Sequence, residues 1–363
     1  YLAFPGAEHT RFGHTLGALA MGDRALSSLQ RQSDGILGDE PAFQAQRRLL
    51  RASLLLHDVG HGPFSHACEA VLGRSHEDRT REILGLAPVR RAIENLDVDP
   101  DAVAALIVGD GTSAAPVLRE LVSGPNLDAD RMDYLLRDAY FTGIAGGRYD
   151  AEQLIASLRA FERGGTLSLG VDVRGIVALE SFVLARYMMF ATVYFHHTTR
   201  MFERILQDAL HDIWPEPRAL DPIEEFLAWD DFRVLEAFRT SASAAAQALR
   251  ERETLYAIVA EFNAEGDLRS YEACKAALVQ RWGDAVWADE QQQLFHRLPM
   301  ESDAPRQLLV GHAGSIVDAR SASDVIARVT GRAYWRKLFV SRGVPVDEAR
   351  ALCREILARS RGA

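Results

Sequence analysis

The chain has 363 residues, enough to bury a sizeable hydrophobic core in one large domain or in two to three ordinary ones. With 48% hydrophobic and 25% charged residues its composition is that of a globular protein, and its net charge of −10 disfavours nucleic-acid binding over the whole surface. No apolar run approaches the ~20 residues of a membrane-spanning helix, so we expect no membrane protein. Cys68, Cys274 and Cys353 lie far apart, which argues against a disulfide scaffold or a cysteine zinc site and predicts a cytoplasmic protein.

Apolar residues recur at three- and four-residue spacing along most of the chain, a pattern typical of amphipathic helices. In chain order the spacing predicts helices at Phe12–Leu29, Phe43–His57, Asp130–Tyr140, Asp150–Phe161, Ile176–Trp214 and Ala349–Arg359. Two segments alternate as strands do: Thr166–Val173, and Gln307–Ala319, which Gly311 and Gly314 interrupt. We therefore expect a mainly α fold.

Two changes of composition divide the chain. Pro215–Pro222 is rich in proline and acidic residues, and Ser241–Ala248 in Ser and Ala. We expect a helical core over residues 1–214 and a smaller C-terminal α/β appendage over residues 215–363. Val317–Ala363 carries ten Arg or Lys against five Asp or Glu. This stretch is either a solvated amphipathic tail or a surface that meets nucleotide phosphates or an acidic neighbouring subunit.

The densest chemical signal is the segment Leu54–Glu69, which reads LLLHDVGHGPFSHACE. A helix that runs into His57 and Asp58 should break at the glycines that follow, and a new one should start near Pro63, because proline is tolerated in a first helical turn. An imidazole beside a carboxylate suits Mn, Fe, Ni, Zn or Mg better than a metal that prefers thiolates. One His-Asp pair is often only a helix end, but the histidines at positions 57, 61, 66 and 76 together favour a metal site.

Two further segments complete the pattern. Pro5–Gly17 reads PGAEHTRFGHTLG, and Leu127–Asp138 reads LDADRMDYLLRD. With the His-Asp pair between them, the chain resembles the HD-domain phosphohydrolases, whose signature is His…His-Asp…Asp. More narrowly, it resembles the branch that contains bacterial and animal deoxynucleoside triphosphate triphosphohydrolases. The resemblance covers roughly Tyr1 to Arg204, and the combination of motifs is specific for the superfamily.

This resemblance implies a helical HD-domain core and a metal held by His14, His57, Asp58 and Asp130. Two imidazoles and two carboxylates leave coordination positions open for a water and a phosphate oxygen. The ion would be Mn, Fe, Ni, Zn, Co or Mg, and a second Mg²⁺ bridged by the substrate phosphates is a further expectation.

Catalytic and substrate-binding roles follow from the same resemblance. His66, with Glu69 three residues later on one helical face, matches the pair that transfers a proton to the leaving 5′-oxygen. His61 and His76 match histidines that line the phosphate path. The further substrate contacts implied are Arg11, Arg131, Tyr134, Asp138, Tyr194, His196 and Arg200.

Structural interpretations of neighbouring residues stay open. Asp133 and Arg137 are four residues apart and would form a helix ion pair. His9 would be a surface residue of the first loop, and Asp128 would cap the helix that bears Asp130.

Two departures from the family bear on the substrate. Family members have a glutamine-bearing stretch near the sugar before the first motif. This chain starts at Tyr1 rather than at Met, so we expect a processed or truncated chain and leave the sugar preference open. Thr192 stands where the animal enzyme has an arginine for the terminal phosphate, which leaves monophosphates, diphosphates and other phosphoesters open.

The leading prediction is metal-dependent hydrolysis of deoxynucleoside triphosphates to deoxynucleoside and triphosphate by a homo-oligomer. One alternative is another HD phosphohydrolase, a nucleotidase or a phosphodiesterase acting on nucleotides or on single-stranded nucleic-acid ends. The other is a catalytically silent nucleotide-binding regulator, against which the presence of all four ligand residues argues.

Overall fold

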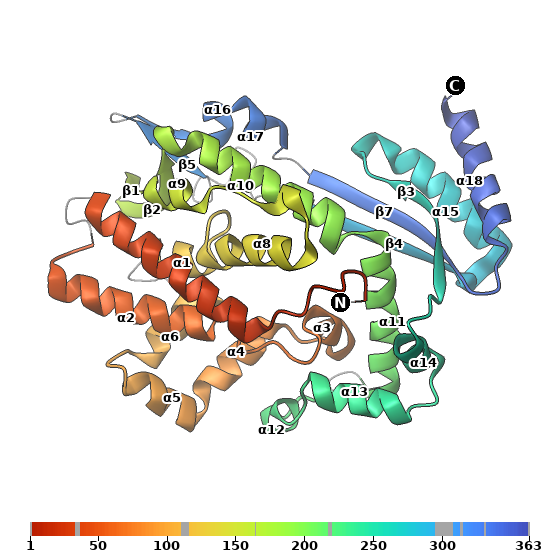
Figure 1. Ribbon diagram of the computed structural model, residues 1–363, viewed down its shortest axis with the longest axis horizontal. Coiled ribbons are helices and arrows are strands. Elements are labelled where there is room, and N and C mark those ends of the chain that lie inside the picture. The colour runs from red at the N-terminus through yellow and green to blue at the C-terminus, as the bar shows by residue number, and fades with distance from the viewer. Residues whose placement is uncertain are drawn as a thin grey trace.

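The computed structural model describes residues 2–32, 37–109, 116–163, 165–216, 220–294, 308–312, 315–329 and 332–361, and its fold is mainly α, as the sequence predicts (Figure 1). The helices are α1 (Arg11–Gln32), α2 (Glu40–Leu56), α3 (His66–Leu72), α4 (His76–Gly85), α5 (Ala87–Glu94), α6 (Pro100–Val108), α7 (Pro116–Ser123), α8 (Ala129–Thr142), α9 (Ala151–Ala156), α10 (Ile176–Met189), α11 (His197–Ile213), α12 (Ile223–Leu227), α13 (Asp231–Thr240), α14 (Ala244–Glu251), α15 (Leu268–Trp282), α16 (Ala319–Ala322), α17 (Asp324–Val329) and α18 (Val346–Arg361). Shorter helical segments are η1 (Ala145–Gly147), η2 (Val173–Gly175), η3 (Phe190–Tyr194), η4 (Glu265–Asp267) and η5 (Gly283–Ala285). The strands are β1 (Leu158–Arg163), β2 (Thr166–Asp172), β3 (Tyr256–Phe262), β4 (Val286–Leu294), β5 (Leu309–His312), β6 (Ser315–Asp318) and β7 (Arg332–Ser341).

A bundle of helices forms the N-terminal core. α1 packs against α2 and α8, α6 and α7 contact α2, and α10 contacts α8. Leu26 and Leu54 are fully buried in this core. Gly22 lets α1 and α2 approach closely, because a Cβ at this position would lie 2.2 Å from Leu54 Cδ1. The site described below is built on the ends of these helices.

A four-stranded sheet covers one end of the bundle, with strand order β1-β2-β5-β6. β1 and β2 are antiparallel, β5 pairs with β2 in parallel, and β6 returns antiparallel to β5. The two predicted strand segments therefore lie in one sheet, although Gln307 and Gly314 fall outside the described residues. The predicted helix Asp150–Phe161 is wrong beyond Ala156, because Leu158–Arg163 pairs along its whole length with β2.

A three-stranded antiparallel sheet, β3-β7-β4, carries the C-terminal part. α15 and α18 pack against each other and contact β4 and β3, respectively. Phe262, Tyr271 and Leu338 are buried in one cluster between these elements. This is the smaller α/β part that the sequence predicts, although its strands were not predicted individually.

The predicted continuous helix Ile176–Trp214 is interrupted. α10 ends at Met189 and passes into η3, a π-helical turn, before α11 begins. His196 caps α11 by accepting a hydrogen bond from Thr198 N, 3.3 Å away. The extra residue of a π-turn changes the direction of the side chains that follow it. Tyr194 consequently contacts Asp138, whereas the ring of Phe195 lies 4.7 Å from that of Trp335.

One apolar segment is longer than the sequence-based expectation about apolar runs allowed. Val173–Tyr194 is a 22-residue helical segment that is long and apolar enough to cross a membrane. Among the described residues, one helix meets this criterion. Phe182, Val183 and Met189 of this segment are buried in the protein core. A core helix passes the same test, so the segment is weak evidence for a membrane span.

Candidate metal centre and substrate site

The four predicted metal ligands come together from three helix ends. His14 lies in the first turn of α1, Asp130 in the first turn of α8, and His57 and Asp58 directly follow α2. Asp130 Oδ1 lies 3.0 Å from His14 Nε2 and 3.8 Å from His57 Nε2. The Asp58 oxygens lie 3.7 Å and 3.4 Å from the same two nitrogens. The donor atoms of His14, His57 and Asp130 all lie within 4.8 Å of one another, so one ion could contact them.

Hydrogen bonding and electrostatics both favour a cation at this point. His57 Nε2 is buried and has no hydrogen-bond partner among the described residues, which is costly for a polar atom that holds no ion. Burial alone would lower the pKa of His14, but Asp130 and Asp133 outweigh it and raise the pKa to about 10. Two imidazole nitrogens and two carboxylates form a donor set that suits a borderline divalent metal. These residues fit such an ion.

The imidazoles of His14 and His57 are held so that the Nε2 atom of each faces the carboxylates of Asp58 and Asp130. His57 Nδ1 lies 2.8 Å from Leu54 O, and His14 Nδ1 lies 2.8 Å from Asp133 Oδ2. Fixing Nδ1 selects the tautomer in which Nε2 is free to bind a metal. Asp133 also binds Arg137, at 2.7 Å from Nε, as the sequence predicted. Its contact with His14 was missed, although Asp133 follows Asp130 by three residues on one helix face.

Arg11 reaches the same centre from the start of α1. Its Nη1 lies 2.5 Å from Asp58 Oδ2, and its Nε donates to Ser65 Oγ at 2.8 Å. Burial opposes ionisation of Asp58, but His61, His57 and Arg11 hold the pKa of this carboxyl well below its usual range.

A second cluster of ionisable side chains lies beside the first. His61, His66 and His76 all approach the carboxylate of Glu69. His61 Nε2 also lies 3.5 Å from Asp58 Oδ1, which links the two clusters. Burial alone would raise the pKa of Glu69, but the three imidazoles outweigh it and lower that pKa. The structure thus places His76 with the predicted catalytic residues rather than on the outer surface.

Two tyrosines and an aspartate form a polar group along α8. Tyr194 Oη donates to Asp138 Oδ2 at 2.6 Å, and Tyr134 meets the Tyr194 ring edge-on. His9 Nε2 lies 2.7 Å from Asp138 Oδ1, and its ring stacks on Phe141 at 4.7 Å. His9 is therefore half-buried at this group, and the surface interpretation of His9 is wrong.

Arg131 and Arg186 bring positive charge behind the metal ligands. Asp128 caps α8 as predicted, by accepting from Arg131 N at 2.8 Å, and it also pairs with the Arg131 guanidinium. Arg186 is buried, and its Nε and Nη1 have no hydrogen-bond partner in the part of the chain that the structure describes. Burial lowers the pKa of Arg186, whereas Tyr134, Asp128 and Asp130 act against that shift. The sequence analysis assigned Arg186 no role in the site, although it is the one arginine of α10.

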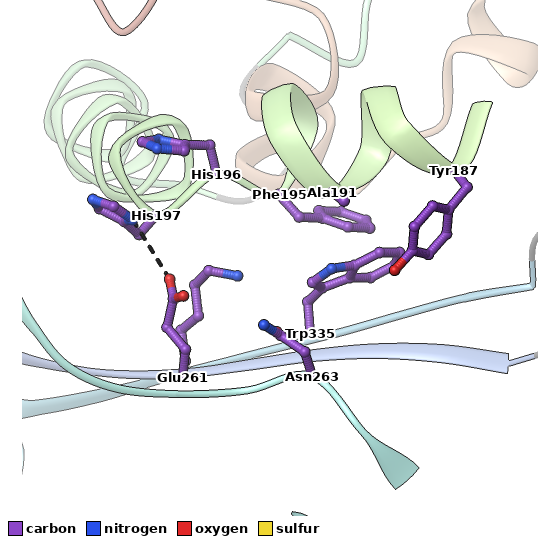
Figure 2. A pocket seen from close by; sticks show the side chains of 9 residues that line it. Tyr187, Ala191, Phe195, His196, His197, Glu261, Asn263 and Trp335 are labelled. Carbon is purple, nitrogen blue, oxygen red and sulfur yellow. Dashed lines mark ion pairs between the residues drawn. The ribbon is translucent and has the colours of Figure 1, made fainter. Parts of the chain in front are cut away.

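His196 and Arg200 lie on the other side of η3, next to the three-stranded sheet. A pocket of about 350 Å³ opens there between η3, α11 and the sheet (Figure 2). It is lined by Tyr187, Ala191, Phe195, His196, His197, Glu261, Asn263, Trp335 and Lys337. Arg200 binds both carboxylate oxygens of Asp289 on β4, at 2.9 and 3.0 Å. Of the three predicted contacts on this late segment, Tyr194 alone joins the residues around Asp138.

Two protein families match this chain. Residues 11–109 match the HD domain, and residues 149–276 match the HD associated region. The first range holds His14, His57 and Asp58, and Asp130 lies between the two ranges.

Individual relatives agree with these matches. The chain is 39% identical over 214 residues to the uncharacterized protein YwfO of Bacillus subtilis, covering 58% of this chain and 46% of YwfO. It is 26% identical over 242 residues to the deoxynucleoside triphosphate triphosphohydrolase SAMHD1 homolog of Dictyostelium discoideum, covering 61% of this chain and 44% of that protein. A crystal structure of a hypothetical protein from Aquifex aeolicus superposes with a TM-score of 0.80 at 27% identity, over 97% of this chain and 89% of that one. The chain spans about half the length of the curated relatives it matches.

Proposed function

We propose that this chain, whose residues 11–109 match the HD domain, is a metal-dependent phosphohydrolase that cleaves deoxynucleoside triphosphates into deoxynucleoside and triphosphate. The observation that carries the proposal is the pair of imidazole Nε2 atoms that face Asp58 and Asp130 next to the His66–Glu69 pair. The substrate class is supported by relatives in Dictyostelium discoideum and Homo sapiens whose names state deoxynucleoside triphosphate triphosphohydrolase.

His14, His57, Asp58 and Asp130 would hold the ion. When bound, a divalent metal supplies Lewis-acid polarisation of a phosphoryl oxygen and lowers the pKa of a water molecule. Arg11 lies against Asp58 and is half-exposed, so its guanidinium can reach a phosphate that approaches from solvent. Arg186, whose buried Nε and Nη1 have no hydrogen-bond partner among the described residues, would offer charge-assisted hydrogen bonds to the same anionic group.

His66 acts as the proton donor in this proposal. Its Nδ1 lies 3.1 Å from Glu69 Oε1, and its side chain is 69% exposed, so Nε2 can face a bound substrate. Water adds to the α-phosphorus and loses a proton to solvent, the bond from phosphorus to the 5′-oxygen breaks, and His66 gives its proton to that oxygen. A positioned acid contributes about 10²–10⁴-fold to such a step.

The polar group of Tyr134, Asp138 and Tyr194 would contact the deoxynucleoside. Tyr134 and Asp138 belong to α8, and Tyr194, the last residue of η3, contacts both of them. His196 and Arg200 are not part of this site, because His196 lines the pocket on the far side of η3 and Arg200 is paired with Asp289.

A hydrolysis screen in ¹⁸O-water tests the proposal. Deoxynucleoside triphosphates, ribonucleoside triphosphates, monophosphates and short oligonucleotides would each be supplied with Mn²⁺ or Mg²⁺. We expect triphosphate that carries ¹⁸O and an unlabelled deoxynucleoside. Asp58→Ala should abolish turnover, whereas Asp101→Ala, which removes an exposed partner of Arg90, should not. Product formed from monophosphates or oligonucleotide ends alone would replace the proposal with one of the other phosphoesterase activities.

The role of His66 has its own test. His66→Ala should lose turnover on the natural substrate yet retain much of its rate on a p-nitrophenyl phosphoester, whose leaving group needs no proton. Equal losses on both substrates would reassign His66 to binding.

A further inference from the structure

Three imidazole nitrogens crowd a single carboxylate oxygen. Glu69 Oε1 lies 3.0 Å from His76 Nδ1, 3.1 Å from His66 Nδ1 and 3.4 Å from His61 Nδ1. The donor atoms of these four residues all lie within 4.8 Å of one another. None of the four belongs to the set His14, His57, Asp58 and Asp130, and proton donation by His66 with Glu69 does not require three imidazoles at one carboxylate oxygen.

Hydrogen bonds do not satisfy all the polar atoms of this cluster. Of the three contacts, His76 to Glu69 has the geometry of a hydrogen bond. His61 Nδ1 is buried and has no hydrogen-bond partner within the described ranges, although the His61 side chain is only 4% exposed. A buried polar atom without a partner costs about 1–3 kcal/mol, unless something absent from the protein chain completes it.

The backbone is shaped to bring these side chains together. Phe64 and Ser65, just before His66, have φ of 55° and 56°, a strained region for residues with a side chain. Gly60 allows the loop to touch α4, because a Cβ there would lie 2.1 Å from His76 O. The His61 and His76 rings stack at 4.0 Å with an interplanar angle of 12°, so one of the two rings must turn out of the stack for both Nδ1 atoms to bind one ion. Backbone strain of this kind persists only where the surrounding contacts enforce it, and it is concentrated at functional sites.

We infer that His61, His66, Glu69 and His76 form a second metal site, for a zinc-class divalent ion, whose occupation blocks hydrolysis. Donor atoms about 2.0–2.2 Å from a tetrahedral ion lie roughly 3.3–3.6 Å apart, close to the separations from Glu69. Three imidazoles and one carboxylate select Zn²⁺ over Mg²⁺ more strongly than the two imidazoles and two carboxylates of the first site do. The exposed His66 leaves the cluster open to an ion from solvent.

The regulatory consequence rests on the proposed function. An ion at His66 Nδ1 prevents that imidazole from carrying the extra proton that it would give to the leaving oxygen. Protein loaded with Mn²⁺ at the first site should therefore lose activity as zinc fills the second, and recover it when a chelator removes the zinc.

Metal stoichiometry and cobalt spectra test the site directly. Elemental analysis of zinc-equilibrated protein should give two ions per chain for the wild type and one for Glu69→Gln or His76→Ala. His14→Ala, which damages the first site, should keep one ion and, with Co²⁺, the intense visible absorption of a tetrahedral nitrogen-rich site. His211→Ala, which removes an exposed histidine on α11, is the matched control and should keep two.

The outcomes separate this inference from the proposed function. Far-ultraviolet circular dichroism would establish that each variant is folded. One zinc per wild-type chain, or two in both Glu69→Gln and His76→Ala, would overturn the second site. Loss of one ion in these variants without zinc inhibition of the wild type would overturn its regulatory role. A wild type that hydrolyses no phosphoester with any metal, yet binds two ions, would overturn the proposed function and leave the second site standing.

Discussion

Asp133→Asn tests whether Asp133, which is not itself a predicted metal ligand, strengthens metal binding by orienting His14. Asp133 is buried and uses both oxygens, one of them 2.8 Å from His14 Nδ1, and both engage Arg137 at 2.7 and 2.9 Å. Asparagine has nearly the same shape but one acceptor oxygen and no charge. An amide nitrogen in place of Oδ1 would face Arg137 Nη2, donor against donor, and the oxygen left for His14 carries no charge, so His14 should become a weaker and less fixed ligand. Losing such a contact costs about 10–100-fold in metal affinity.

That factor corresponds to about 1.4–2.7 kcal/mol of binding free energy. At saturating metal the same amount should disappear from the metal-dependent part of the free energy of unfolding. Calorimetric titration with Mn²⁺ would measure the affinity, and urea unfolding with and without Mn²⁺ would measure the stabilisation. The difference between the two urea experiments removes any direct effect of losing the Arg137 ion pair.

Two further variants decide the interpretation. Arg137→Met keeps the contact between Asp133 and His14, so its metal affinity should stay within about threefold of wild type. Gly17→Ala should mimic Asp133→Asn, because a Cβ at Gly17 would lie 1.8 Å from Asp133 Oδ1 and displace that side chain. Wild-type affinity in Asp133→Asn, or an equal loss in Arg137→Met, would show that Asp133 only packs α1 against α8.

Three other predictions follow from the structure and the charge pattern. Arg186→Met should lower kcat/KM for the triphosphate substrate by about 10–100-fold, from charge-assisted hydrogen bonds of ~1.5–3 kcal/mol, without lowering the urea midpoint; unchanged kinetics with a lower midpoint would make Arg186 structural. Burial raises the pKa of Glu120 to about 7, above its unfolded value, so its stabilising contribution is complete below the unfolded value and is lost as pH rises through 7. Glu120→Gln keeps an acceptor for Leu169 N and should remove up to about 3 kcal/mol of the wild-type decline between pH 5 and 8, which urea titrations at both pH values would measure. The negative chain with its positive Val317–Ala363 stretch should form a homo-oligomer that loosens as salt screens charges beyond ~10 Å at 0.1 M, and a monomer by light scattering at low salt would contradict this.

The convergence of His14, His57, Asp58 and Asp130 was predicted from the resemblance of three separate motifs to the HD-domain phosphohydrolases, not from the spacing of these residues in the chain. Asp133 and Arg186 were not predicted as site residues. Their roles depend on contacts between helices, and an aspartate four residues from an arginine looks like a surface ion pair when read alone. The site roles of Asp133 and Arg186 therefore depend on where these residues lie in the folded protein, and their residue types alone do not reveal them.

The elements of the fold divide in the same way into those predicted from nearby residues in the chain and those decided by contacts between distant residues. α1, α2 and α8 follow from the three- and four-residue spacing of apolar side chains, which is a local property. Leu158–Arg163 was predicted as helix because its strand conformation depends on pairing with β2. Similarly, the break at η3 is decided by the contacts of Tyr194 and Phe195 with different parts of the protein.

The parallel pairing of β5 with β2 has a consequence for how the protein is made. Gly170 pairs with Leu309, and Leu308, Val310 and Ile326 belong to the same core cluster as Leu26 and Leu54. During translation, β2 therefore presents an open edge until the ribosome has released the chain beyond β5, and open strand edges invite pairing with other chains. A nascent chain stalled or cut near residue 214 should therefore aggregate, because β2 would lack its β5 partner.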